Sequence, residues 1–136
     1  MSHTHDVVIV GGGIAGCALA TVLARRGVAV TVLERDLEPV DRVRGEFMAP
    51  WGVIEAKRLG LLDALHAAGG VFSRRNIPYD ENTPGEQALA FALTYADVVP
   101  EVPGAFCMGH PAMCRVLARE AEAAGATSCV ASRTST

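Results

Sequence analysis

The chain has 136 residues, of which 50% are hydrophobic and 20% charged, and its formal net charge is −3. This composition excludes intrinsic disorder and predicts one modest domain with a packed core. The slight negative charge does not favour nucleic acid or an anionic membrane as a partner.

The first 34 residues predict a strand, a glycine-rich loop, a helix and a second strand. Residues 6–10, DVVIV, are a short β-branched run typical of a buried parallel strand. The helix is expected over residues 14–26, with two arginines in its last turn and Gly27 as its C-terminal cap. Residues 28–34, VAVTVLE, predict a second buried strand, which completes a βαβ unit.

An uncharged run over residues 7–24 is long enough to suggest a transmembrane helix. Three consecutive glycines interrupt it, and its valine-rich start favours a buried strand. We therefore expect no membrane segment and no membrane partner.

A polar loop separates the βαβ unit from the rest of the chain. Residues 50–59, which begin with a proline, and residues 61–70 each predict a short helix. The stretch 71–104 is turn-rich, with a strand expected over 88–95, and it indicates an excursion toward a β-rich substrate layer. A longer helix is expected from about Pro111 to a stop at Gly125.

The cysteines are scattered, with no C-x-x-C pair and no metal-ligand spacing: Cys17, Cys107, Cys114 and Cys129. This pattern predicts reduced, mostly buried thiols and no metal site. It also favours a cytoplasmic location, where thiols stay reduced.

The loop between the first strand and helix contains the spacing G-x-G-x-x-G, formed by Gly11, Gly13 and Gly16. The first glycine permits a tight turn, the second lets the backbone approach a pyrophosphate, and the third lets the helix pack on the strand. Amide groups at the helix start, around Ile14 and Ala15, then meet the anion. Glu34 ends the second strand, where a carboxylate accepts hydrogen bonds from a ribose.

Together these features predict a dinucleotide site in an α/β, Rossmann-like domain with a parallel sheet. The alternative is a glycine-rich turn that binds nothing. Glu34 also argues against a nicotinamide cofactor with a 2′-phosphate, because the two anions would repel.

The segments "VVIVGGGIAGCALATVLARRGVAVTVLER" and "RVRGEFMAPWGVIEAKRLGLLDAL" resemble the FAD-binding domain of flavoprotein aromatic hydroxylases. These are FAD-dependent monooxygenases of the para-hydroxybenzoate hydroxylase-like family. The resemblance covers residues 6–65 and returns over 110–125. It implies that the protein binds FAD, takes electrons from NAD(P)H and uses O₂ to hydroxylate a small organic substrate.

The resemblance also implies roles for residues of this chain. The three motif glycines would hold the FAD pyrophosphate, Glu34 the adenosine ribose, and Arg35 would flank the adenine. Arg44 would reach the cofactor, with Gly45 and Glu46 beside the ribityl and flavin path. Arg42, in the same loop, is as easily a solvated arginine. No catalytic residue can be assigned.

The chain departs from the family pattern at two places. Many relatives have an FAD-binding arginine where His110 stands; His110 can still donate a hydrogen bond, but the permanent charge is lost. Arg115, one turn further on, would have to reach around the helix to replace it. Residues 126–136 are polar and without alternation where the family has a short apolar strand, as a shifted reading frame would produce.

The family's later Gly-Asp fingerprint does not occur in this sequence. Residues 1–136 are therefore expected to be the N-terminal portion of an incomplete FAD-binding domain, whose partner would be the missing C-terminal half. A stand-alone nucleotide-binding module or inactive remnant is the alternative. Half of an NAD-dependent dehydrogenase is disfavoured by the arginine loop.

Overall fold

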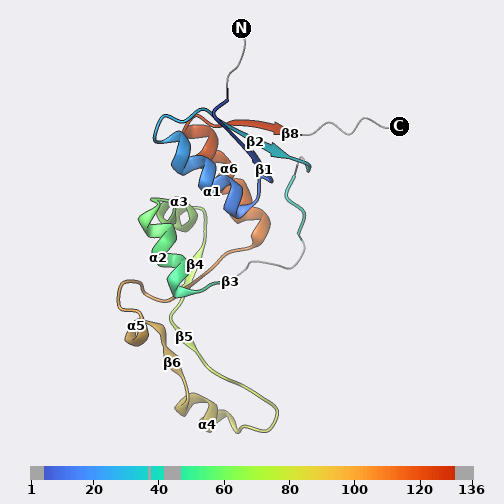
Figure 1. Ribbon diagram of the computed structural model, residues 1–136. Coiled ribbons are helices and arrows are strands. Elements are labelled where there is room, and N and C mark those ends of the chain that lie inside the picture. Colours follow the sequence, from blue (N-terminus) through green and yellow to red (C-terminus); the bar gives the residue numbers. More distant parts are fainter. Residues whose placement is uncertain (1–4, 37, 42–46, 131–136) are drawn as a thin grey trace, which may run out of the picture.

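A computed structural model describes residues 5–36, 38–41 and 47–130. A three-stranded parallel sheet lies at one end of the molecule, in the order β1 (Val7–Val10), β2 (Val30–Glu34) and β8 (Thr127–Val130). Val7 pairs with Val30, and Thr31 pairs with Thr127. The helices α1 (Ile14–Ala24) and α6 (His110–Ala123) pack side by side against one face of this sheet (Figure 1).

The predicted βαβ unit is confirmed, with shorter elements than the sequence suggests. Helix α1 ends at Ala24, and Gly27 follows in the left-handed conformation, with φ +80°. Arg25 is the C-cap residue, so the prediction of two arginines in the last helical turn is wrong. Its guanidinium instead donates to the carbonyl of Leu59 and pairs with Glu120, each at 2.9 Å, because these groups lie close to the end of α1.

A second, antiparallel sheet lies beyond the helices, in the order β3 (Phe47–Met48), β7 (Ala105–Cys107) and β4 (Val71–Ser73). The predicted short helices form as α2 (Pro50–Arg58) and α3 (Leu62–Ala67). The main core joins these elements to α1 and α6, and its most buried large side chains are Phe106, Leu65, Met113 and Leu117.

The strand expected over residues 88–95 is wrong for most of its length. Residues Gly85–Ala90 form helix α4, Leu93–Thr94 form β6, and Tyr95–Val98 form helix α5. Pro84 sets the start of α4, and the alanine, leucine and glutamine that follow favour a helix. Only β6 is extended, because it pairs antiparallel with β5 (Arg75–Asn76) in the arm that projects from the molecule in Figure 1.

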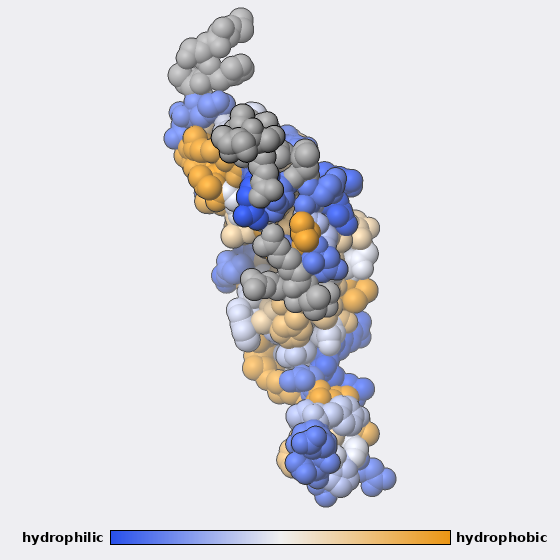
Figure 2. Space-filling view, turned by 90° about the vertical axis from the view of Figure 1, so that its right-hand side faces the viewer, coloured by the Kyte–Doolittle hydropathy of each residue, from blue (hydrophilic) through white to orange (hydrophobic). Residues whose placement is uncertain are grey.

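Two predictions about the parallel sheet need correction. The polar segment after Gly125 does form a strand, β8, because its backbone pairs with β2 along four residues. Strand β1 is parallel, as expected, but only half-buried: Val8 is 54% exposed and Val10 85% exposed. Their side chains alternate with those of Val7 and Ile9, which pack toward α1, and therefore lie on the opposite face of the sheet. Figure 2 shows exposed apolar surface on the molecule.

Among the described residues, no helix combines the length and apolar character that crossing a membrane requires. The uncharged run of residues 7–24 is divided between β1 and α1, as the glycines predict.

Candidate functional site

The glycine loop joins the carboxyl end of β1 to the start of α1. Gly11 has φ +104°, a conformation that other residues rarely adopt, and its N–H donates to the Leu33 carbonyl at 2.8 Å. A Cβ on Gly16 would overlap the Gly11 carbonyl oxygen, so only glycine lets the helix approach the turn this closely. A Cβ on Gly13 would point into open space. The turn and packing roles predicted for these glycines fit this geometry.

Glu34 is held at the end of β2 by three backbone amides. Its Oε2 accepts a hydrogen bond from Gly12 N–H at 2.5 Å, and its Oε1 accepts from the N–H groups of Arg35 at 2.7 Å and Asp36 at 3.0 Å. Hydrogen bonding from Asp36, and then from Gly12 and Arg35, lowers the pKa of Glu34, although partial burial acts in the opposite direction. The ionised carboxylate is therefore fixed beside the glycine loop.

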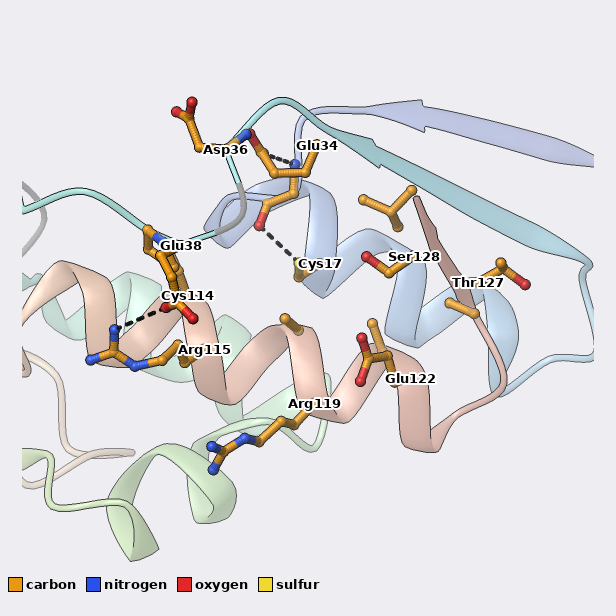
Figure 3. A pocket seen from close by; sticks show the side chains of 16 residues that line it. Cys17, Glu34, Asp36, Glu38, Cys114, Arg115, Arg119, Glu122, Thr127 and Ser128 are labelled. Atoms are coloured by element: carbon orange, nitrogen blue, oxygen red, sulfur yellow. Dashed lines mark hydrogen bonds and ion pairs between the residues drawn. The ribbon is translucent and has the colours of Figure 1, made fainter. Parts of the chain in front are cut away.

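Two cavities meet at this carboxylate. The larger, of about 320 Å³, lies between the end of β2, the start of β8 and helix α6 (Figure 3). Glu34, Arg115 and Ser128 line it from these three elements. The smaller, of about 210 Å³, is lined by Gly12 and Gly13 of the loop, by Glu34 and the segment after it, and by His110 and Cys114 of α6.

The smaller cavity is bordered by the start of both helices. Gly13 is the N-cap residue of α1 and Gly109 that of α6, and neither supplies a side-chain hydrogen bond to its helix. Uncapped N-termini carry partial positive charge and favour an anion. The carboxylate of Glu34 lies on the same cavity and suits hydroxyl donors.

The structure brings together most of the predicted residues that it describes. Gly13, Glu34, Arg35 and His110 line the smaller cavity, and Gly11 and Gly16 shape the turn. Ile14 and Ala15 begin α1 but line neither cavity. Arg42, Arg44, Gly45 and Glu46 lie outside the described residues.

The cations beside the site have acidic partners. The Arg35 guanidinium pairs with Asp36 at 3.0 Å, and Arg115 pairs with Glu38 at 4.0 Å. Arg115 lines the larger cavity, whereas His110 lines the smaller one. His110 also lies against Cys114, with 3.6 Å between Nε2 and Sγ.

Among the residues at the loop and the cavities that sequence reasoning missed are one glycine and two cysteines. Gly12, the middle of three consecutive glycines, donates to Glu34 and leaves room for its side chain. Cys17 and Cys114 are buried and line the larger cavity. The triple glycine is a signal for Gly12, but scattered cysteines give none. No cluster suited to a metal ion occurs in the part of the chain that the structure describes.

A glycine loop and a strand-end carboxylate on a parallel sheet define a Rossmann-like, dinucleotide-binding α/β domain. A family model described as an FAD binding domain matches residues 4–134. The chain therefore belongs to this FAD-binding family, that of the para-hydroxybenzoate hydroxylase-like flavin monooxygenases.

Curated relatives are similar to the chain over part of its length. Squalene epoxidase erg1 of Aspergillus fumigatus is 44% identical over 72 residues, which are 52% of this chain and 15% of the relative. Squalene monooxygenase of Rattus norvegicus is 42% identical over 100 residues, with 63% of this chain and 18% of the relative covered.

Solved structures share the fold over nearly the whole chain. The p-nitrophenol 4-monooxygenase PnpA from Pseudomonas putida aligns with a TM-score of 0.79 and 22% identity, over 96% of this chain and 32% of PnpA. The anhydrotetracycline hydroxylase OxyS from Streptomyces rimosus aligns with a TM-score of 0.71 and 25% identity, over 93% of this chain and 24% of OxyS. The chain thus spans a third or less of these solved relatives.

Proposed function

We propose that this chain binds the adenosine diphosphate part of FAD. The loop glycines Gly11, Gly13 and Gly16 and the N-termini of α1 and α6 receive the diphosphate, and Glu34 accepts hydrogen bonds from the ribose. Arg35 flanks the adenine, and His110 donates to the diphosphate from α6. Arg44, Gly45 and Glu46 belong to the same proposal through their match to the family's motif.

The observation that carries this proposal is the position of the Glu34 carboxylate. It lies on the same cavity as Gly13 and His110, which mark the start of α1 and of α6. One cavity thus offers an acceptor for hydroxyl groups and a partial positive charge for an anion. A ribose linked to a diphosphate carries both complementary groups.

The charge of the site also selects among dinucleotides. The pKa of Glu34 is lowered, so its carboxylate is ionised at neutral pH. A 2′-phosphate on the ribose would lie against this negative charge. FAD and NAD⁺ carry free ribose hydroxyls and avoid the repulsion.

We further propose that the chain forms the FAD-binding part of a flavin-dependent monooxygenase that hydroxylates a small organic compound. When bound, the flavin would supply the redox chemistry: it would accept electrons from NAD(P)H and react with O₂. The residues of this chain bind and orient the adenosine end of that cofactor. Relatives named for squalene and for p-nitrophenol share the matched part, so we propose no narrower substrate class.

The proposal is tested by titrating the chain with FAD and following flavin fluorescence and absorbance. We expect saturable binding that excess ADP reverses, because the contacts lie on the adenosine diphosphate part. NAD⁺ and NADP⁺ serve as matched competitors. Absence of FAD and ADP binding would contradict the proposal, and tighter binding of NAD⁺ than of FAD would favour a dehydrogenase site.

A binding module without turnover is the second candidate function. The described residues of the two cavities offer contacts to the adenosine diphosphate part of the cofactor, and a module would need the same contacts. Anaerobic addition of NADH or NADPH to the FAD complex separates the candidates. Loss of the oxidised flavin absorbance supports turnover, and bound flavin that stays oxidised supports the module.

A further inference from the structure

The peptide groups of Gly12 are held by side chains from two different elements. Its N–H donates to Glu34 Oε2, at the end of β2. Its carbonyl oxygen accepts a hydrogen bond from the Cys17 thiol of α1, with 3.0 Å between Sγ and oxygen. Figure 3 shows the dashed line that ends at Cys17, below Glu34. Gly12 is thus held from both sides.

The Gly12 carbonyl belongs to the same peptide group as the Gly13 N–H. In a trans peptide these two groups point in opposite directions. The structure has no cis peptide bond among its described residues. Because the carbonyl is directed at Cys17 in the interior, the Gly13 N–H is directed away from Cys17, and Gly13 itself lines the smaller cavity. Rotating this peptide would exchange the two groups and present an oxygen to an incoming anion.

We propose that Cys17 is a positioning residue, whose thiol holds the Gly12–Gly13 peptide in the orientation that accepts a diphosphate. This inference rests on the proposed function, because it assigns the thiol a part in cofactor binding. Glycine residues permit more than one orientation of this peptide, and the hydrogen bond from the thiol favours one of them. A loop that spends less time in the competent orientation binds its ligand more weakly.

The environment of Cys17 keeps this hydrogen bond in place at neutral pH. The side chain is 3% exposed. Burial, followed by the nearby Cys114, Glu34 and Glu122, raises the pKa of Cys17 to about 11. A thiol donates only while it carries its proton, so Cys17 remains a donor throughout the physiological range.

The experiment compares Cys17→Ala, which removes the donor, with Cys17→Ser, which keeps one. Thr21→Val is the matched control, because the Thr21 hydroxyl is also buried in α1 but donates within the helix, to the Cys17 carbonyl at 2.7 Å. The readouts are the dissociation constants for FAD and for ADP, and amide hydrogen exchange of the ligand-free chain followed by NMR.

We expect Cys17→Ala to raise both dissociation constants about 3- to 10-fold, the effect of one lost hydrogen bond. Cys17→Ser and Thr21→Val should stay close to the parent chain. Exchange at Gly12, whose N–H is bonded to Glu34 in the held loop, should accelerate in Cys17→Ala alone.

Unchanged exchange and unchanged affinities in Cys17→Ala would overturn the inference. Equal losses in Cys17→Ala and Cys17→Ser would also overturn it, because they would assign the effect to packing and not to the donor. If the parent chain binds neither FAD nor ADP, the proposed function fails, and exchange in the ligand-free chain still decides whether Cys17 orders the loop.

Discussion

Replacing Glu34 by glutamine tests the electrostatic centre of the site. Glutamine keeps one oxygen, which can accept hydrogen bonds from the N–H groups of Arg35 and Asp36. Its NH₂ group would then face the Gly12 N–H, which donates to the carboxylate in the parent chain, and two donors cannot bond to each other. A hydrogen bond to a charged group contributes about 1.5–3 kcal/mol. The carboxylate is only partly buried, so solvent screening favours the lower end. We therefore expect Glu34→Gln to lower the free energy of unfolding by about 1.5 kcal/mol at neutral pH.

The pH dependence identifies the source of this loss. Because the folded protein lowers the pKa of Glu34, its contribution is complete above the usual glutamate range and is lost as the pH falls through the folded value. The deficit of Glu34→Gln, measured by urea denaturation, should therefore stay constant between about pH 7 and about pH 5 and shrink as the pH falls further. Glu38→Gln is the control, because Glu38 is 81% exposed and its ion pair with Arg115 is long, at 4.0 Å. A deficit that is constant with pH, or equal in the two variants, would refute the reasoning.

Three further substitutions follow from the geometry. Gly16→Ala places a methyl group against the Gly11 carbonyl oxygen, so we expect a loss of about 2 kcal/mol or more in thermal unfolding, with FAD binding impaired at least about tenfold. Arg25→Met removes the hydrogen bonds to the Leu59 carbonyl and to Glu120, and should lower the free energy of unfolding by about 1 kcal/mol in urea denaturation. An unchanged free energy of unfolding would show that these exposed contacts do not stabilise the fold. His110→Arg should tighten ADP binding about 2- to 5-fold, because a guanidinium brings a permanent charge to the cavity that Gly13 also lines; unchanged or weaker ADP binding would contradict this reason.

The βαβ unit could be predicted because its signals are local. The sequence has a β-branched run, then three glycines, then a second run that ends in a carboxylate. This order is typical of a βαβ nucleotide-binding unit, and the structure confirms its two strands and its helix. The same local signals located Gly27 and Gly125, which both have positive φ at helix ends. Each individual signal is a short stretch of sequence, and consecutive signals follow one another along the chain from Val7 to Glu34.

The wrong predictions fall where the structure depends on strand pairing or on what packs over a sheet face. Residues 127–130 have a polar sequence, and they are a strand because β2 offers them an unpaired edge. Residues 85–90 are helical, although their alanine and leucine content was also compatible with a strand. The exposure of Val10 could not be read from its own sequence, because burial of a strand depends on what covers each face.

The contribution of α6 to the site follows from topology rather than from a motif. Strand β8 runs parallel to β2, so the helix that precedes β8 must begin near the carboxyl edge of the sheet and return along it. Helix α1 begins at that same edge, directly after β1. The two helix N-termini therefore meet at one cavity, although Gly13 and His110 are almost a hundred residues apart in the sequence. The residue at the first position of α6 borders the same cavity as the glycine loop, so we expect the identity of residue 110 to change the affinity for a nucleotide even though the loop itself is unchanged.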